Sequence, residues 1–249
     1  MKIKEAVHQL RECGAIGLKA GFEAEGQALD EIVRMSTLDP ALPLTVKIGG
    51  PEARTDLRSL VDWSIFSFVA PMVESPFAVL KTVQNAAAIT EGDLSRFTIS
   101  LNMESVAAHV ARRAILGCEA AKAVSKVNVG RTDLAASIGA PVESPQVQQM
   151  TRDIIDEARS VGKTTGVGGS LAPSTIEKFL AACKVDEFET RHVIFRTDRV
   201  RDAHAAVVAA LDFELLLLDW LNAPWMRLVK DAKSRSQELH RRLSRPIVA

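Results

Sequence analysis

Two acidic residues in the middle of the chain, Glu104 and Asp133, stand where divalent-metal chemistry could take place. Each follows a short run of β-prone residues, 97–101 for the first acid and 124–129 for the second, where the run gives way to a polar turn. Two such carboxylates would emerge from the same rim of one sheet. Mg²⁺ and Mn²⁺ are typically held by one or two carboxylates, together with waters and substrate oxygens. The spacing alone is compatible with a metal site that a 2-oxo acid could chelate, and equally with ordinary solvated loop acids.

The segments around these acids alternate between strand-like and helical patterns. We expect strands over residues 15–22, 44–48, 65–72, 97–101, 124–129, 163–167 and 189–195, and helices over residues 1–14, 26–38, 77–89, 106–116, 144–161 and 173–183. Nearly continuous apolar strands between amphipathic helices favour a parallel sheet covered on both faces. The pattern predicts an α/β fold of the TIM (β/α)₈ type. It gives seven clear strands and no evident eighth, so a barrel that lacks the usual first strand is also compatible.

Two more helices are predicted after the last strand, over about residues 199–221 and 224–243. The first contains the apolar block 215–218 and is apolar on nearly every side, so something must cover it. We therefore divide the chain into a barrel catalytic domain, residues 1–200, and C-terminal helices, residues 201–249. These helices are expected to pack on the barrel or on a neighbouring subunit, and we expect a homo-oligomer.

Composition excludes several classes of partner. The chain has 249 residues, an ordinary length for one α/β barrel, and its 31 basic residues balance 31 acidic ones. No basic run is interleaved with aromatic residues, so we expect neither nucleic acid nor a membrane as a partner. The scattered Cys13, Cys118 and Cys183 suit a reducing compartment, and the first residues lack the pattern of a signal peptide. We expect a cytoplasmic protein that acts on small molecules.

Polar residues or glycines follow nearly every predicted strand. In chain order they are Glu23, Glu25, Lys47, Glu74, Glu104, Asp133, Gly168, Gly169, Glu189 and Arg191. In parallel barrels the carboxyl ends of the strands meet on one face and carry the chemistry. Gly168 and Gly169 are expected either to form a tight turn or to receive a ligand carboxylate or phosphate on their N–H groups.

Three of these strand ends carry motifs. They are Pro71-Met72-Val73-Glu74, Asn102-Met103-Glu104-Ser105 and Gly130-Arg131-Thr132-Asp133-Leu134. In their order and spacing they resemble the HpcH/HpaI aldolase and citrate lyase superfamily, over about residues 15–220. The resemblance implies a barrel fold, and it implies that Glu104 and Asp133 hold a divalent metal, Mg²⁺ or Mn²⁺.

The chain departs from the family pattern at two places. Lys47 falls where the family has an arginine beside the substrate, and a lysine cannot offer the bidentate fork of a guanidinium. The family histidine that serves in acid/base catalysis is also absent, because the turn reads Glu23-Ala24-Glu25. Glu23, Glu25 or a water on the metal could take its place. The five histidines of the chain are expected to be structural.

The resemblance implies a class II aldolase or lyase. Such an enzyme cleaves or forms a C–C bond through the enolate of pyruvate or a related 2-oxo acid, with an aldehyde as the other substrate. Lys47 would support the enolate, and Arg191 would either receive the distal end of the acceptor or pair with Glu189. Three alternatives stay open: a lyase that acts on a CoA thioester, a Schiff-base aldolase that uses Lys47 or Lys19, and a noncatalytic barrel subunit.

Overall fold

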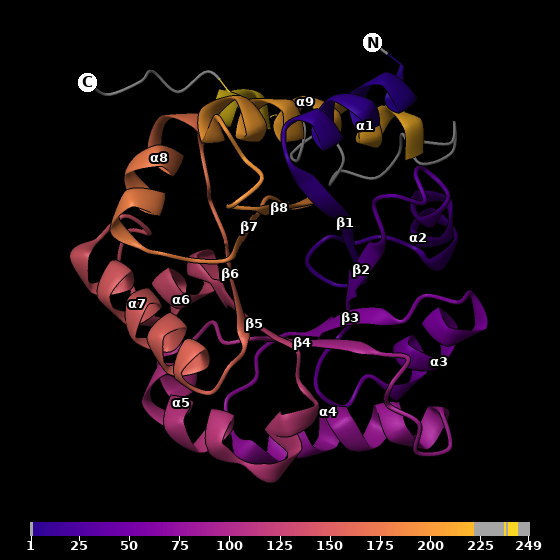
Figure 1. Ribbon diagram of the computed structural model, residues 1–249, viewed down its shortest axis with the longest axis vertical. Helices are drawn as coiled ribbons and strands as arrows, with labels where there is room; N and C mark the ends of the chain where they lie inside the picture. Colours follow the sequence, from indigo (N-terminus) through magenta and orange to yellow (C-terminus); the bar gives the residue numbers. More distant parts are fainter. Residues whose placement is uncertain (1, 222–236, 238, 244–249) are drawn as a thin grey trace.

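Eight strands close into a barrel with helices around its outside (Figure 1). The computed structural model describes residues 2–221, 237 and 239–243. The strands, which pair in chain order, are β1 (Ala15–Gly21), β2 (Leu44–Lys47), β3 (Ser67–Ala70), β4 (Thr98–Asn102), β5 (Lys126–Gly130), β6 (Thr164–Gly168), β7 (Glu187–Glu189) and β8 (Val193–Arg196). The predicted TIM-type barrel is confirmed.

The barrel departs from a regular (β/α)₈ arrangement at its end. The strands β1 to β7 run parallel, whereas β8 runs antiparallel to both β7 and β1. The single strand predicted over residues 189–195 was therefore wrong. The N–H of Thr190 donates to the carbonyl of Val193 at 3.0 Å, which closes a tight turn and divides the segment into a hairpin. The predicted segment covers most of β8 and only the last residue of β7, so the prediction contained one strand where the structure has two.

Helices fill the connections and cover the sheet. They are α1 (Ile3–Glu12), α2 (Leu29–Ser36), α3 (Arg54–Asp62), α4 (Pro76–Ile89), α5 (Val106–Gly117), the 3₁₀ helix η1 (Glu119–Ala123), α6 (Arg131–Ile138), α7 (Pro145–Ser160), α8 (Pro173–Ala182) and α9 (Ala203–Leu221). Ser75, Ser105 and Ser144 cap α4, α5 and α7 with their side chains, as serine commonly does. The sequence patterns did not predict α3, η1 and α6.

The inside of the barrel is polar. On β4 and β5 the apolar residues Ile99, Leu101, Val127 and Val129 alternate with Ser100, Asn102, Lys126 and Asn128, and all eight are buried. Lys126 of β5 reaches past β6 to Glu187 of β7, with 2.5 Å between Nζ and Oε2. Gly166 of β6 leaves the space for this pair, because a Cβ there would overlap the side chains of Asn128 and Lys126. The alternation thus sends apolar side chains toward the helices and polar ones inward.

After the barrel, α9 packs against α1 and α8 (Figure 1). Phe213 and Leu217 of α9 are buried, whereas Leu215, Leu216 and Leu218 are partly buried. Most of the helix predicted over residues 224–243 lies outside the described residues, although residues 239–243 are helical and Leu239 is buried in the core. Among the described helices, none combines the length and the hydropathy that a membrane span requires.

Candidate active site at the carboxyl ends of the strands

A cavity of about 210 Å³ lies at the carboxyl ends of the strands. Seven of the eight site residues predicted from the sequence line it: Glu25, Lys47, Glu104, Asp133, Gly168, Gly169 and Arg191. Glu23 does not. The connections that follow β1, β2, β4, β5, β6 and β7 thus converge on one small space, as strand ends do in parallel barrels.

Glu104 is one of the acids that line this cavity. It stands between β4 and α5, just before the capping residue Ser105, and only 1% of its surface is exposed. Its Oε2 accepts a hydrogen bond from Nδ2 of Asn102 at 3.0 Å. Its Oε1 accepts the backbone N–H of Met72 at 3.1 Å and lies 3.7 Å from Nζ of Lys47. The carboxylate is therefore fixed by three groups that lie at or just after the ends of β2, β3 and β4.

The Pro71-Met72-Val73-Glu74 motif braces Glu104 from the neighbouring connection. Met72 has a φ of 53°, an uncommon value for a residue with a side chain, and this conformation accompanies the donation of its N–H to Glu104. The hydroxyl of Ser105 in turn donates to the carboxylate of Glu74 at 2.5 Å. Glu74 thus holds the connection that carries Glu104.

Asp133 lies in the first turn of α6, which starts directly after β5. Arg131, at the start of the same helix, is fully buried, pairs with Glu143 at 3.1 Å and lies over the ring of Phe179. These contacts fix the helix that carries Asp133. At the end of β5, a Cβ on Gly130 would overlap Oε2 of Glu104, so glycine allows the close approach of the two acidic connections.

The electrostatics of the site favour a cation beside Glu104. Burial raises the pKa of Glu104 above its ordinary value, and the charge of Asp133 raises it further, although the ammonium of Lys47 opposes both. Oδ1 of Asn102 is buried and has no hydrogen-bond partner among the described residues. A buried carboxylate, a second carboxylate and an amide oxygen are donors that suit a hard divalent cation.

These residues fit Mg²⁺ or Mn²⁺ as an open site. Within the described part of the chain, no three His, Cys, Asp or Glu side chains come together as a metal cluster. Glu104 and Asp133 would therefore supply two carboxylates and leave the other positions to water and substrate, as Mg²⁺ sites commonly do.

The two lysines of the cavity differ. Lys47 ends β2 and its side chain is 13% exposed, beside Glu104. Lys19 of β1 is buried, and its Nζ lies 2.5 Å from Oε1 of Glu189. Burial alone would lower the pKa of Lys19, but the carboxylates of Glu189 and Glu25 outweigh it and raise the pKa. Lys19 therefore stays protonated, which is the opposite of what an imine-forming lysine needs.

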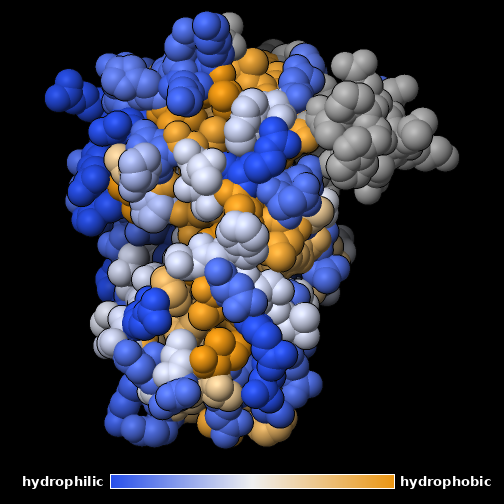
Figure 2. All heavy atoms as spheres, turned by 90° about the vertical axis from the view of Figure 1, so that its right-hand side faces the viewer, coloured by the Kyte–Doolittle hydropathy of each residue, from blue (hydrophilic) through white to orange (hydrophobic). Residues whose placement is uncertain are grey.

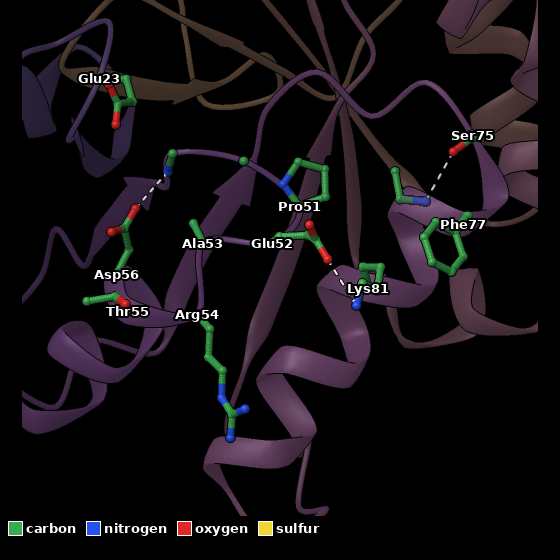
Figure 3. A pocket seen from close by; sticks show the side chains of 13 residues that line it. Glu23, Pro51, Glu52, Ala53, Arg54, Thr55, Asp56, Ser75, Phe77 and Lys81 are labelled. Carbon is green, nitrogen blue, oxygen red and sulfur yellow. Dashed lines mark hydrogen bonds and ion pairs between the residues drawn. The ribbon is translucent and has the colours of Figure 1, made fainter.

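The turn after β1 separates its two acids. Glu25 is 5% exposed and lines the cavity, and its Oε2 is buried without a hydrogen-bond partner among the described residues. Glu23 lines a second pocket of about 660 Å³, which is formed by the β2–α3 connection and the start of α4. Figure 3 shows Glu23 in that pocket, across from Asp56, whose Oδ2 accepts the N–H of Gly49 at 2.8 Å. Only Glu25 can meet a ligand in the cavity.

Arg191 lies in the hairpin turn between β7 and β8. Its Nη1 donates to the carbonyl of Ala24 at 3.0 Å, which ties the hairpin to the turn after β1. The pairing of Arg191 with Glu189, which the sequence left open, is absent among the described ion pairs, because Glu189 pairs with Lys19 at 2.5 Å and with Lys126 at 3.7 Å. The guanidinium lines the cavity instead.

Gly168 and Gly169 line the cavity and also satisfy steric demands. Gly169 has a φ of +89°, and a Cβ there would lie 2.6 Å from the backbone N of Thr132. A Cβ on Gly168 would lie 3.0 Å from Cγ of Glu189. Gly169 therefore needs glycine, whereas a side chain at Gly168 would crowd Glu189. The contact of both glycines with a ligand stays a prediction.

Several cavity residues escaped prediction, among them Asn102, Thr132, Ser170, Thr190 and Arg242. Asn102 and Thr132 stand inside the acidic motifs, where a polar residue next to a ligand-bearing acid was a usable signal. Arg242 lines the cavity from the C-terminal segment, and its place in a basic stretch offered no such signal.

Comparison with known proteins supports the fold. No family model matches the sequence, and no curated protein is similar enough in sequence to count as a relative. Among solved structures, the chain is similar to an HpcH/HpaI aldolase from Desulfitobacterium hafniense, with a TM-score of 0.61 and 18% identity over 75% of this chain and 82% of that one. It is also similar to an HpcH/HpaI aldolase/citrate lyase family protein from Burkholderia cenocepacia, with a TM-score of 0.60 and 15% identity over 86% and 91% of the two chains.

A citrate lyase from Burkholderia xenovorans is similar at a TM-score of 0.52 and 11% identity, over 90% of this chain and 91% of that one. Identities this low establish likeness of fold and leave the reaction to be argued from the site. The chain shares its barrel fold with HpcH/HpaI aldolase and citrate lyase structures, as its three strand-end motifs predicted.

Proposed function

We propose that the protein is a metal-dependent lyase of the aldolase type. It would cleave or form a C–C bond through the enolate of pyruvate or a related 2-oxo acid, with an aldehyde as the other substrate. The observation that carries the proposal is the convergence of Glu104, Asp133 and Lys47 on one buried cavity. A divalent metal held by the two acids, when bound, would stabilise negative charge on the oxygens of the 2-oxo acid.

Other residues of the cavity would have separate roles in the reaction. Lys47 places an ammonium within 3.7 Å of the Glu104 carboxylate, where it can stabilise the charge that develops on the enolate oxygen. The Met72 N–H and the Asn102 amide hold Glu104 in a fixed orientation. Arg191 faces the cavity from the opposite connection and would receive the distal end of the substrate.

Glu25 is the acid/base candidate that the structure favours over Glu23, since only Glu25 lines the cavity. In the cleavage direction its carboxylate would accept the proton of the 4-hydroxyl group of a 4-hydroxy-2-oxo acid. The oxygen electrons would then form the aldehyde carbonyl, the C3–C4 bond would break, and its electron pair would pass into the enolate. Protonation of C3 completes the 2-oxo acid, and aldol addition is the reverse.

The size of the cavity favours a small substrate. Its volume of about 210 Å³ lies below the roughly 300–1,000 Å³ of pockets that enclose drug-sized ligands. A lyase that acts on a CoA thioester is the second candidate, because the pocket of about 660 Å³ lies on the other side of the Glu23–Glu25 turn. However, the acids Glu23, Glu52 and Asp56 outnumber the cations Arg54 and Lys81 in that pocket. Lys81 already pairs with Glu52 at 2.9 Å, so the charge of the pocket does not favour the phosphates of a nucleotide.

The test is the removal of each acid. Glu104→Gln and Asp133→Asn should each abolish Mn²⁺ binding and aldol cleavage, while circular dichroism shows an unchanged fold. The control is Glu119→Gln, which removes an exposed acid of η1 and should bind Mn²⁺ like the wild type. EDTA should inactivate the wild-type protein fully. If either active-site variant retained full affinity for Mn²⁺ in calorimetry, the metal site would be misassigned.

A further inference from the structure

Arg242 lies in the C-terminal segment, after the last strand of the barrel, and its side chain lines the cavity at the carboxyl ends of the strands. It lies on a short helical stretch, residues 239–243, whose Leu239 is buried in the core and whose Leu243 packs against it. Residues three and four apart share a helix face, so Arg242 lies on the face that docks. Its Nη2 donates to the carbonyl of Leu171 in the β6–α8 connection, and its side chain lines the cavity.

The charges that line the cavity indicate which kind of ligand group Arg242 would bind. Four cations and four anions among the described residues line it: Lys19, Lys47, Arg191 and Arg242, and Glu25, Glu104, Asp133 and Glu189. These described residues are thus formally neutral together, and a divalent metal would leave an excess of two positive charges among them. The carboxylate of a 2-oxo acid supplies one negative charge. A second anionic group on the substrate would balance the site.

The cations are divided around the rim. Lys47 lies at the end of β2, beside the Glu104 connection of β4. Arg191 follows β7, and Arg242 lies against the connection that follows β6. A substrate held by its 2-oxo acid end near Glu104 and Lys47 would direct its other end toward the arginines. A guanidinium presents a planar fork that matches a carboxylate.

We propose that Arg242 is a specificity-determining residue that binds a carboxylate at the distal end of the aldol substrate. The C-terminal segment thereby completes the substrate site of the barrel and selects dicarboxylates over monocarboxylates. The inference rests on the proposed function for the identity of the substrate, but the binding of a dicarboxylate tests it separately.

The first experiment measures selectivity. Two 4-hydroxy-2-oxo acids are compared, one with a carboxylate and one with a methyl group as carbon 5. Arg242→Gln should lower kcat/KM for the carboxylate substrate by about 10- to 100-fold, the usual effect of losing one charged hydrogen-bond partner, and should change the methyl substrate by less than about 2-fold. Arg242→Lys should fall between wild type and Arg242→Gln. Equal loss for both substrates would overturn the assignment.

A matched control is the exposed neighbour Arg241 on the same helical stretch. Arg241→Gln removes the same charge and should leave the preference for the carboxylate substrate unchanged. If it weakened that preference as much as Arg242→Gln does, general charge rather than a contact of Arg242 would be the cause, and the proposal would fail. Should Arg242→Gln not fold, the same comparison is made with Arg242→Lys, which must still shift the preference.

The second experiment separates this inference from the proposed reaction. Succinate and propionate are titrated by calorimetry into the protein in excess Mg²⁺. Succinate should bind the wild type more tightly than propionate does, and Arg242→Gln should remove that difference. If the wild type cleaves neither aldol substrate, but Arg242→Gln abolishes the preference for succinate that the wild type shows, the proposed reaction is wrong and the role of Arg242 stands. Unchanged succinate binding in Arg242→Gln would disprove that role.

Discussion

At the scale of single residues, Glu104 is a buried carboxylate at the centre of the proposed metal site. Its carboxylate is 1% exposed, and burial is the first cause of its raised pKa. The Met72 N–H, the Asn102 amide and the Lys47 ammonium offset part of the cost of burying that charge. The nearby charge of Asp133 adds to the cost. A cation bound between Glu104 and Asp133 would offset the remaining cost.

Lys47 decides between metal and imine chemistry. If it supports a metal enolate, Lys47→Arg should keep measurable activity, because the positive charge survives beside Glu104. Lys47→Ala should lose roughly 2–4 kcal/mol of transition-state stabilisation, as the loss of a charge-stabilising donor typically does. Steady-state kinetics with the 4-hydroxy-2-oxo acids measures both effects.

The opposite result has a clear signature. An imine-forming Lys47 would make both variants equally inactive, since arginine cannot form the imine. Borohydride added with pyruvate would then trap an adduct that chelators do not prevent. We expect no adduct, and a mass-spectrometric adduct on Lys47 or Lys19 would disprove the metal mechanism.

Seven of the eight site residues predicted from the sequence line the cavity, but the sequence could not reveal their partners. Glu104 and Asp133 were recognisable because an acid after a strand meets others at the rim. The role of the Met72 N–H could not be recognised from the sequence, because it depends on the backbone conformation at Met72, which the type of side chain does not indicate. Glu23 and Glu25 were indistinguishable by type, and only the turn conformation sends them to different pockets.

At the scale of elements, the β7–β8 hairpin links the cavity to the outer helices. The backbone N–H of His192 donates to Oε1 of Glu214 on α9 at 3.0 Å, and Nδ1 of its ring donates to the carbonyl of Lys19 at 2.9 Å. Phe188 and Phe195 stack with 5.0 Å between ring centroids. The hairpin that carries Arg191 is thus held from both sides.

The hairpin should make stability depend on pH. Burial lowers the pKa of His192 below its ordinary value of 6.5, although Glu214 and the Lys19 carbonyl, and more weakly Glu25, oppose this and Arg191 adds to it. As the pH falls below about 6.5, His192 binds a proton in the unfolded chain before it does so in the folded chain. The contribution of neutral His192 to stability is therefore present above about pH 6.5 and is lost as the pH falls below it. One such proton changes the unfolding free energy by up to about 1.4 kcal/mol per pH unit.

His192→Gln tests this. Urea unfolding between pH 7 and pH 5 should show a smaller loss of stability in the variant than in the wild type. His8→Gln, which changes an exposed histidine of α1, is the control and should keep the wild-type dependence. An identical dependence in His192→Gln would show that His192 does not contribute.

The two α-helices missing from the prediction differ in their sequence patterns. The helix α3 is amphipathic, with Leu57 and Leu60 on its buried face, so its pattern was a usable signal. The eight residues of α6 show no regular alternation of apolar and polar faces. The packing of Arg131 at its start, rather than helical periodicity, fixes α6. The hairpin turn likewise lacks glycine and proline, so its residues read as a continuous strand.

At the scale of the whole molecule, large apolar side chains reach the surface on the outer helices. Trp63, Phe77 and Val110 are 55%, 64% and 74% exposed. Figure 2, which faces the side that carries α2 and α3, shows hydrophobic atoms at the surface between charged side chains. On α9, Leu215, Leu216 and Leu218 are only partly buried by the chain itself. Surfaces of this kind commonly mark contacts between proteins.

We expect a homo-oligomer. Sedimentation at micromolar concentration should give a mass well above the 27.0 kDa of one chain. If the apolar side of α9 lies in the interface, protection of residues 213–221 from hydrogen exchange should fall on dilution, because dissociation exposes it. Protection of α7, residues 145–160, provides the internal control and should not change. A monomer at micromolar concentration with residues 213–221 protected at every dilution would contradict the expectation, since it would show that α9 is fully covered by its own barrel.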